Sequence, residues 1–406
     1  MINLEVPKKF KPLITNANQV AKEVLRPISR KYDAAEHEYP KELDMLAALI
    51  DGMNDSGGGT AGGAGASGVS QASDEDKTEG NRNGSNLSTV LAIQEMCWGD
   101  VGLTLSMPRQ GLGNSAIAAV ASDEQKERFA GKWASMAITE PEAGSDSAAI
   151  RTTAVLDGDE YVLNGEKIYV TAGERCDLVV VWASLDRDAG RAAIKSFVVE
   201  RSNPGMKLDR LEHKLGIRAS DTAAFILDDC RVPKEDLLGS PEIDMKKSFA
   251  GAMKTFDNTR PLVAGMALGV ARACIELTEE KLAEVGVGVD FDRSPHSQSA
   301  AASELLSLQA DYEASRLLTM EAAWMADNGK PNSLQASYAK CKAGRCGTDI
   351  ALRCVALCGS VGYDEAELLE KWARDAKILD IFEGTQQIQQ LIIARTLLGL
   401  SSAELH

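Results

Sequence analysis

The spacing of apolar residues divides the chain into a helical stretch, a strand-rich stretch and a second helical stretch. Apolar positions recur at helical spacing over residues 8–50, with Pro27 predicted as a boundary between two helices, and again over residues 86–133. From residue 243 onwards the helical period returns. Breaks in these helices are predicted at residues 285–297, 328–331, 359–362 and 383–384.

Residues between 135 and 233 have the composition and alternation of β-strands. The predicted strands are 150–156, 161–163, 167–171, 178–183, 195–200 and 223–227. Asn164-Gly165 predicts a type I′ hairpin, and Asn203-Pro204-Gly205 predicts a further turn. The pattern therefore predicts an α+β multidomain protein: a helical N-terminal domain (1–133), a middle, mostly antiparallel β-domain (134–237) and a C-terminal helical domain (238–406).

Residues 56–85 interrupt the first helical stretch. Gly, Ala, Ser, Asn and Asp dominate this segment, which cannot bury enough apolar area to offset the cost of ordering, so a mobile loop or linker is predicted. A phosphate-binding role for its glycine run is disfavoured, because no strand precedes the run and no Gly-Lys-Ser/Thr follows it.

Composition and charge narrow the functional classes. The chain has 406 residues, of which 44% are hydrophobic, and a net charge of −16, which argues against nucleic-acid binding. We found no uncharged apolar run of ~20 residues and no signal-peptide pattern, so we expect a soluble, cytoplasmic protein without a membrane span. The eight cysteines form no Cys-x-x-Cys pair and are expected to be reduced thiols that hold no metal.

Glu383 is the residue that most needs explanation. It lies between apolar neighbours and Gly384, at the predicted bend between two apolar helices. Desolvation there would favour the neutral carboxyl and raise its basicity, as proton abstraction requires. The alternative is an ordinary surface glutamate in a helix linker.

Two further segments have residues suited to holding a ligand. In residues 138–146, Gly144 allows close backbone approach, and the amides and hydroxyl of Gly144 and Ser145 could bind an oxyanion such as pyrophosphate; the alternative is a simple turn. Tyr169 and Thr171 alternate along one strand and are expected on the same face, where they could form the floor under a flat heterocycle or be an ordinary cross-strand pair.

Three more polar residues are candidates for a role in a site or in a helix terminus. Arg260 could counter a ligand anion or the base, whereas Asp257, at the start of a predicted long helix, is by default a helix cap. His213 lies among charged neighbours and is interpreted as a solvated loop residue.

Taken in order, these segments resemble the acyl-CoA dehydrogenase family over residues 8–400. The resemblance rests on the Thr-Glu-Pro-x-Ala-Gly-Ser-Asp turn, the Asn-Gly pair, Lys-Leu-Gly-Ile-Arg-Ala-Ser at 214–220, the Asp-x-x-Arg-Pro segment and Glu-Gly-Thr-x-Gln-Ile-Gln at 383–389. It implies a C-terminal four-helix bundle, bound FAD, and α,β-desaturation of an acyl-CoA thioester in lipid catabolism, with electrons passed to an electron-transfer flavoprotein or a similar acceptor. An acyl-CoA oxidase is the alternative enzyme. The chain length and shape of the acyl group stay open.

The resemblance also implies roles for individual residues. Glu383 matches the base that removes the α-proton. Asp257 and Arg260 match the acyl-CoA channel, and Gly384 lies beside the thioester contact. The matches to flavin contacts are Ile138, Thr139, Gly144, Ser145, Tyr169, Thr171, Thr385 and Gln387, and Tyr169 stands where many members have Trp.

The chain departs from the family pattern where members form tetramers and complete one another's FAD site. The Arg-x-x-Phe-Gly segment is replaced by residues 286–296, in which Phe291 precedes Arg293, and Ala356 and Ser360 replace a Gln and a Gly. We therefore predict a tetramer that includes a paralogous subunit supplying the missing contacts. A purely structural subunit of such an assembly is the alternative role.

Overall fold

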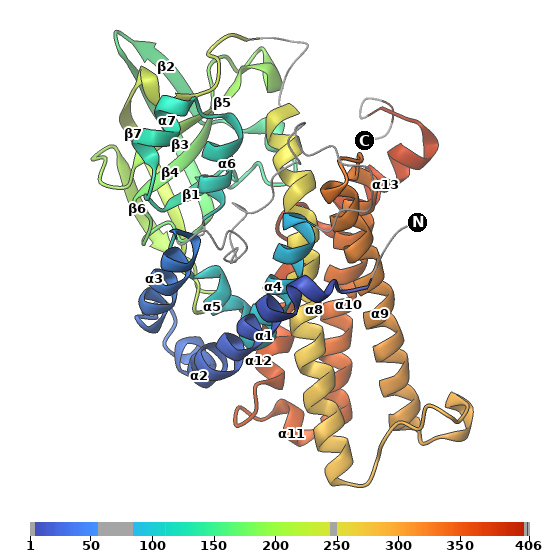
Figure 1. Ribbon diagram of the computed structural model, residues 1–406. Helices are drawn as coiled ribbons and strands as arrows, with labels where there is room; N and C mark the ends of the chain where they lie inside the picture. The colour runs from blue at the N-terminus through green and yellow to red at the C-terminus, as the bar shows by residue number, and fades with distance from the viewer. Residues whose placement is uncertain (1–4, 56–83, 110, 244–249, 402–403, 405–406) are drawn as a thin grey trace.

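The computed structural model describes residues 5–55, 84–109, 111–243, 250–401 and 404. Figure 1 shows a sheet domain at upper left, a helical bundle at right, and the N-terminal helices running beneath the sheet and across the bundle. This arrangement confirms the predicted fold class. Most of the 56–85 segment, which we predicted to be a mobile loop, lies outside the described residues.

The N-terminal helices are more continuous than the sequence indicated. Pro27 does not separate two helices: it is the second residue of α2, and a π-helical turn at Ala21–Leu25 joins α1 to α2. The wider turn accommodates the missing N–H and the ring of Pro27 without a break. The described helices are α1 (Lys11–Val20), α2 (Arg26–Ala34), α3 (Glu42–Asp55), α4 (Ser85–Gly99), α5 (Val101–Leu105), α6 (Leu112–Val120) and α7 (Asp123–Phe129).

The middle domain is a mixed but mainly antiparallel sheet. Its strands run in the order β6-β7-β3-β2-β4-β5-β8, and β1 pairs in parallel with β4. Buried side chains on its two faces form separate cores, one centred on Phe197 and Phe225 and one on Val180 and Val198. The strands are β1 (Ala134–Ala137), β2 (Thr153–Asp157), β3 (Glu160–Thr171), β4 (Leu178–Ser184), β5 (Ile194–Glu200), β6 (Met206–Leu211), β7 (Thr222–Pro233) and β8 (Leu237–Leu238).

The prediction of a hairpin turn at Asn164-Gly165 was wrong. β3 runs straight through this pair, and the β2–β3 connection lies at Gly158-Asp159. Asn164-Gly165 is instead a bulge against β7, where the Asn164 side chain accepts from the Asp229 amide at 2.8 Å. A Cβ on Gly165 would come within 2.4 Å of Thr152 Oγ1, so the glycine serves close packing inside a strand.

The C-terminal domain is built on three long helices and a broken fourth. Its helices are α8 (Ala250–Glu284), α9 (Ala300–Asp327), α10 (Ser333–Cys358), α11 (Ser360–Tyr363), α12 (Leu369–Ala376) and α13 (Gln386–Leu398), with a 3₁₀ turn at Lys377–Asp380. The predicted breaks at 285–297, 328–331, 359–362 and 383–384 match the helix ends. An 18-residue window of α8 within Thr259–Glu284 is apolar enough for a membrane span, but 83% of it is buried inside the molecule, as expected of the central helix of a bundle.

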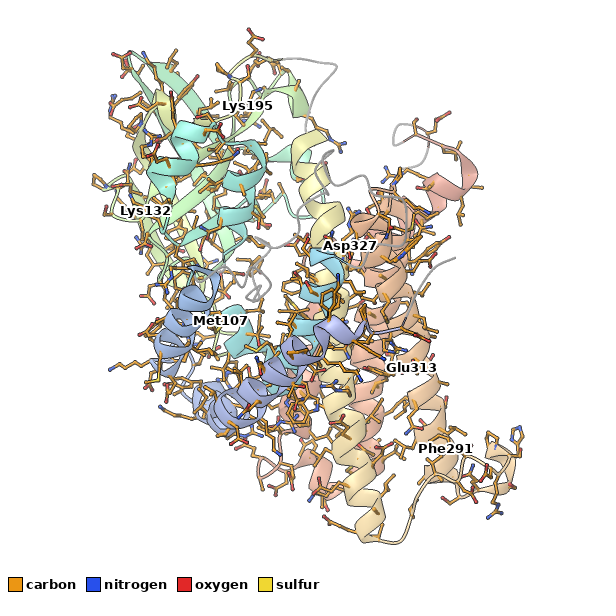
Figure 2. All side chains as sticks on the ribbon, in the orientation of Figure 1. Met107, Lys132, Lys195, Phe291, Glu313 and Asp327 are labelled. Atoms are coloured by element: carbon orange, nitrogen blue, oxygen red, sulfur yellow. The ribbon has the colours of Figure 1, made fainter. Side chains whose placement is uncertain are left out.

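Helix α4 packs into the core of the C-terminal bundle. Its residues share one hydrophobic cluster with α8, α9 and α10, and a Cβ at Gly269 of α8 would meet the Gln94 carbonyl at 2.3 Å. Asp327, labelled in Figure 2, is the last residue of α9 and caps the start of α4. Its carboxylate accepts from the amides of Gly84, Asn86 and Leu87 at 2.8–3.1 Å.

A buried ion cluster joins the three domains. Lys371 of α12 is 1% exposed and contacts Asp100, before α5, and Asp375, whose Oδ2 lies 2.6 Å from its Nζ. Asp375 also accepts from the amide of Ile217 in the β-domain at 2.5 Å. Because both carboxylates are fully buried, this lysine compensates charge that would otherwise oppose folding.

Candidate functional site

Glu383 lies at the bend between the 3₁₀ turn and α13. Glu383 and Gly384 have φ values of 56° and 89°, so two successive residues are in the left-handed region. Thr385 then caps α13, because its Oγ1 accepts from the Ile388 amide at 3.3 Å. A non-glycine residue held in this conformation stores local strain, and such residues concentrate at functional sites.

The carboxylate of Glu383 reaches across to α8. Thr259 is 4% exposed, and its Oγ1 donates to Glu383 Oε2 at 2.9 Å. Burial raises the pKa of the Glu383 carboxyl above its ordinary value, while the Thr259 hydroxyl and the charges of Arg260 and Lys340 act in the opposite direction. The net result is a carboxylate more basic than one in water.

Two side chains fix the backbone of the same bend. Lys340 of α10 is fully buried, and its Nζ donates to the Gly384 carbonyl at 2.6 Å. The buried Gln389 side chain donates to the carbonyls of Glu383 and Gly384 at 3.3 and 3.1 Å. The left-handed backbone at Glu383 is therefore held from two helices.

A second group of predicted residues meets near the end of β3, an inner strand of the sheet. Lys167 of β3 is completely buried; its Nζ donates to the Ile138 carbonyl at 3.0 Å and contacts Glu140 Oε1 at 2.7 Å. The Ile168 amide donates to the Thr139 carbonyl at 2.9 Å. These bonds bring the 138–146 turn beside the end of β3, which the sequence could suggest only as two separate motifs.

The end of β3 does not alternate regularly. A second bulge lies between Lys167 and Val170, Tyr169 has a φ of 58°, and Lys167 and Ile168 are both buried. The bulge means that strict alternation from the start of β3 cannot by itself place Tyr169 and Thr171, so their shared face stays a prediction. The bulge leaves Tyr169 61% exposed and Thr171 half-buried, on either side of the buried Val170.

The remaining predicted residues are placed as follows. Asp257 is not a helix cap, because α8 begins at Ala250 and includes it; its side chain lies outside the description. Arg260 is 3% exposed beside Glu383, and Gln387 lies exposed on the first turn of α13. Gly144 and Ser145 are exposed in their turn.

His213 forms part of a contact between domains. Its Nδ1 lies 2.9 Å from Glu36 Oε2, and potential ligand atoms of Glu36, His37 and His213 lie within 4.8 Å of one another. Glu36 already binds the Arg218 side chain and the Lys214 amide, at 3.2 and 2.9 Å. Because a guanidinium and a backbone amide already satisfy this carboxylate, the cluster is better suited to joining the domains than to holding a metal ion.

Sequence reasoning missed Thr259, Lys340 and Gln389 as site residues. Thr259 stands directly before Arg260, and Gln389 lies inside the motif that contains Glu383. The available signal for Lys340 was a lysine in a helical stripe of small, buried residues, since a buried lysine requires a specific partner. That stripe comprises Ala336, Ala339, Ala343 and Gly344.

Comparison with known proteins gives consistent matches along the chain. Three family models match: the acyl-CoA dehydrogenase N-terminal domain at residues 9–137, the middle domain at 135–230 and the C-terminal domain at 249–398. A short-chain specific acyl-CoA dehydrogenase of Clostridium acetobutylicum is 35% identical over 326 residues, covering 78% of this chain and 84% of the relative.

Two solved structures are similar over nearly the whole chain. Butyryl-CoA dehydrogenase from Megasphaera elsdenii has a TM-score of 0.82 and 28% identity, covering 98% of this chain and 100% of its own. A chain from a structure described as the electron transferring flavoprotein of Acidaminococcus fermentans has a TM-score of 0.81 and 31% identity, with coverage of 98% and 100%.

Proposed function

The chain belongs to the acyl-CoA dehydrogenase family, and on this premise we propose that Glu383 is the base that removes the α-proton of an acyl-CoA thioester. The observation that carries the assignment is the half-buried Glu383 carboxylate, held by Thr259 on a strained bend that Lys340 and Gln389 anchor. The α-C–H of a thioester is a weak acid, so a carboxylate of ordinary pKa would be too weak a base to remove its proton efficiently. Burial raises the pKa of Glu383 in the required direction.

The residues around Glu383 have separate proposed roles in stabilising the base and binding the substrate. Arg260 is a buried cation close enough to act on the carboxylate and is suited to stabilising its ionised form between turnovers. Gly384 is the proposed backbone contact beside the thioester carbonyl; a Cβ there would come within 2.5 Å of the Gln389 amide nitrogen, so larger residues would displace the bend. We assign Asp257 to the acyl-CoA channel by its place in the motif.

Family members are flavoproteins, and the residues of the β-domain fit an FAD cofactor. Tyr169 presents an exposed aromatic ring, Thr139 and Thr171 lie half-buried nearby, and the exposed Gly144 turn has open space where a side chain would stand. Flat heterocycles stack on such rings, and phosphate oxygens accept from such turns. FAD, when bound, accepts the β-hydrogen of the substrate as a hydride. Thr385 and Gln387, at the start of α13, are assigned to its adenosine half.

The substrate we propose is a short-chain acyl-CoA, consumed in lipid catabolism. The proposal is supported by the names of the relatives, which are a short-chain specific acyl-CoA dehydrogenase and a butyryl-CoA dehydrogenase. Electrons would pass to an electron-transfer flavoprotein, in keeping with the description of the Acidaminococcus fermentans structure. Oxygen consumption without an added acceptor would instead favour an acyl-CoA oxidase. We also propose a cytoplasmic location, consistent with eight free thiols.

The assembly we propose includes a paralogous subunit. The loop between α8 and α9, which replaces the family's Arg-x-x-Phe-Gly segment, projects from the bundle with Phe291 73% exposed (Figure 2). Arg293 donates to the Ser297 carbonyl of the same loop at 2.6 Å. Losing a charge-assisted contact to the pyrophosphate should cost about 1.5–3 kcal/mol of FAD binding. A partner that supplies this contact would restore it.

The assembly is tested by purifying the chain alone and with a co-expressed paralogue, then measuring native mass and flavin content. We expect a mixed tetramer with more flavin per subunit than the chain alone retains. A fully flavinated homotetramer would contradict the partner proposal.

The activity is tested by mass spectrometry of butyryl-CoA incubated with the flavin-loaded protein and an artificial electron acceptor. We expect a product that has lost two hydrogens. If the flavin-loaded wild type formed none from straight or branched short-chain acyl-CoAs, the structural-subunit role would replace the enzyme assignment.

A further inference from the structure

Lys340 is a buried cation that the proposed reaction does not yet use. It lies on α10 with no exposed surface, on a helix face of small buried residues that include Ala336, Ser337 and Gly344. Placing an ammonium in such a site opposes folding unless a specific interaction compensates for its lost hydration. Its bond to the Gly384 carbonyl, at 2.6 Å, links it to the bend that contains Glu383.

Hydrogen bonding alone does not require a charged group at this position. Gln389 already donates to the same Gly384 carbonyl, at 3.1 Å, and to the Glu383 carbonyl. A neutral donor therefore satisfies the backbone of the bend from the α13 side. What the ammonium adds is positive charge next to a desolvated carboxylate.

The charged groups around Lys340 come from several elements. Asp380 of the 3₁₀ turn and Glu383 of the bend favour its protonated form, as does Cys341 of its own helix, whereas Arg260 of α8 disfavours it. Burial is the largest influence and lowers the pKa of Lys340 to about 8. At neutral pH the ammonium is therefore still mostly protonated and acts on Glu383 as a cation.

We propose that Lys340 is a positioning residue for the base: it anchors the bend through Gly384, and its charge keeps the Glu383 carboxylate ionised in a desolvated place. This inference rests on the proposed role of Glu383 in α-proton removal. The desolvation that makes Glu383 basic also favours its protonated form, in which it cannot act as a base. Lys340 moderates that effect, so that the carboxylate is both basic and available.

The test isolates proton removal from hydride transfer. A short acyl-CoA whose β-carbon is replaced by sulfur can lose an α-proton but has no β-hydrogen to give up. Its α-deuterium uptake in D₂O is followed by mass spectrometry across pH, with flavin-loaded wild type, Lys340→Met, Lys340→Arg and Lys342→Met. Lys342 is the matched control, because it lies on the same helix but is 41% exposed and pairs with Asp311.

Lys340→Met should slow exchange at neutral pH about 10- to 100-fold, because the bend loosens and less of the base is ionised. It should also move the midpoint of the pH profile upwards by about one unit, because a nearby positive charge is lost. Lys340→Arg should restore the midpoint, and Lys342→Met should match the wild type. Lys340→Gln, an uncharged donor, is measured alongside and should show the raised midpoint even if Lys340→Met does not fold.

Two outcomes would overturn the inference. If folded Lys340→Met or Lys340→Gln had the wild-type midpoint in the pH profile of exchange, the role of Lys340 would be contradicted. The role of Glu383 as the base would stand, because the wild type would still exchange its α-proton. A flavin-loaded wild type that exchanges no α-proton would overturn the proposed function, and this inference with it.

Discussion

The Oγ1 of Thr259 lies 2.9 Å from Oε2 of Glu383, a bond that joins α8 to the bend before α13 across 124 positions of the chain. It orients a carboxylate whose backbone is left-handed and whose neighbours are buried cations. Orientation, desolvation and a nearby positive charge are the three conditions for a carboxylate to remove a weakly acidic proton at neutral pH.

Replacing Glu383 by Gln should abolish dehydrogenation while leaving the fold and flavin content intact. The amide keeps the size of the side chain and can still bond Thr259, but it cannot accept a proton. We expect turnover to fall by about 10²–10⁴-fold, the range for loss of a general base. Product formation from butyryl-CoA measures it, and activity above one tenth of wild type would show that another group removes the proton.

The pH dependence of turnover should report the raised pKa of Glu383. The base acts only when deprotonated, so kcat/KM should rise with pH through a midpoint above that of an ordinary glutamate. Thr259→Val removes a hydrogen bond that lowers this pKa, and the midpoint should therefore move further upwards, by about one pH unit. Thr319→Val is the control, because the buried Thr319 hydroxyl donates to the Ser315 carbonyl of its own helix, away from Glu383 in the sequence. A downward shift in Thr259→Val would contradict the account.

The buried cluster at the domain junction should be required for stability. Lys371→Met leaves Asp100 and Asp375 buried without their shared cation, and we expect a loss of about 3–5 kcal/mol in the free energy of unfolding. Urea unfolding measures this loss. Lys207→Met, which removes an exposed partner of Asp228, should unfold like the wild type. If the two variants were equally stable, Lys371 would not be compensating the buried charges of Asp100 and Asp375.

Asp327 should stabilise the first turn of α4, which follows the 56–83 segment. Asp327→Ala removes the acceptor of the first amides of α4, and a loss of about 2–3 kcal/mol is expected. Asp327→Asn, which keeps one oxygen, should lie between the alanine variant and the wild type. Hydrogen exchange of the α4 amides would reveal the effect locally; unchanged protection in Asp327→Ala would refute the capping role.

Local signals in the sequence predicted the domain order and the helix breaks. A Gly or Asn follows the ends of α8, α9, α10 and α13 within two residues, and these residues act on their own backbone. Glu383 was recognisable for the same reason, standing next to a glycine between apolar helices. The turn at Asn203-Pro204-Gly205 also formed as predicted, with the Asn203 side chain accepting from the Gly205 amide.

The features that the sequence did not predict depend on residues far away in the chain. Asn164-Gly165 has the composition of a hairpin turn, but pairing with β7 and contact with Thr152 make it a bulge. Helix α8 begins before Asp257, so no residue near that aspartate marks its start. The burial of Lys340 is explained by its hydrogen bond to the Gly384 carbonyl, 44 residues further along the chain.

The most direct test of the central claim is anaerobic titration of the flavin-loaded protein with butyryl-CoA, recorded in the visible spectrum for the wild type and for Glu383→Gln. The account predicts that substrate bleaches the flavin band of the wild type and leaves that of the variant unchanged. Equal bleaching of both proteins would show that Glu383 is not the base, and a wild-type band that no short-chain acyl-CoA bleaches would contradict the proposed dehydrogenation.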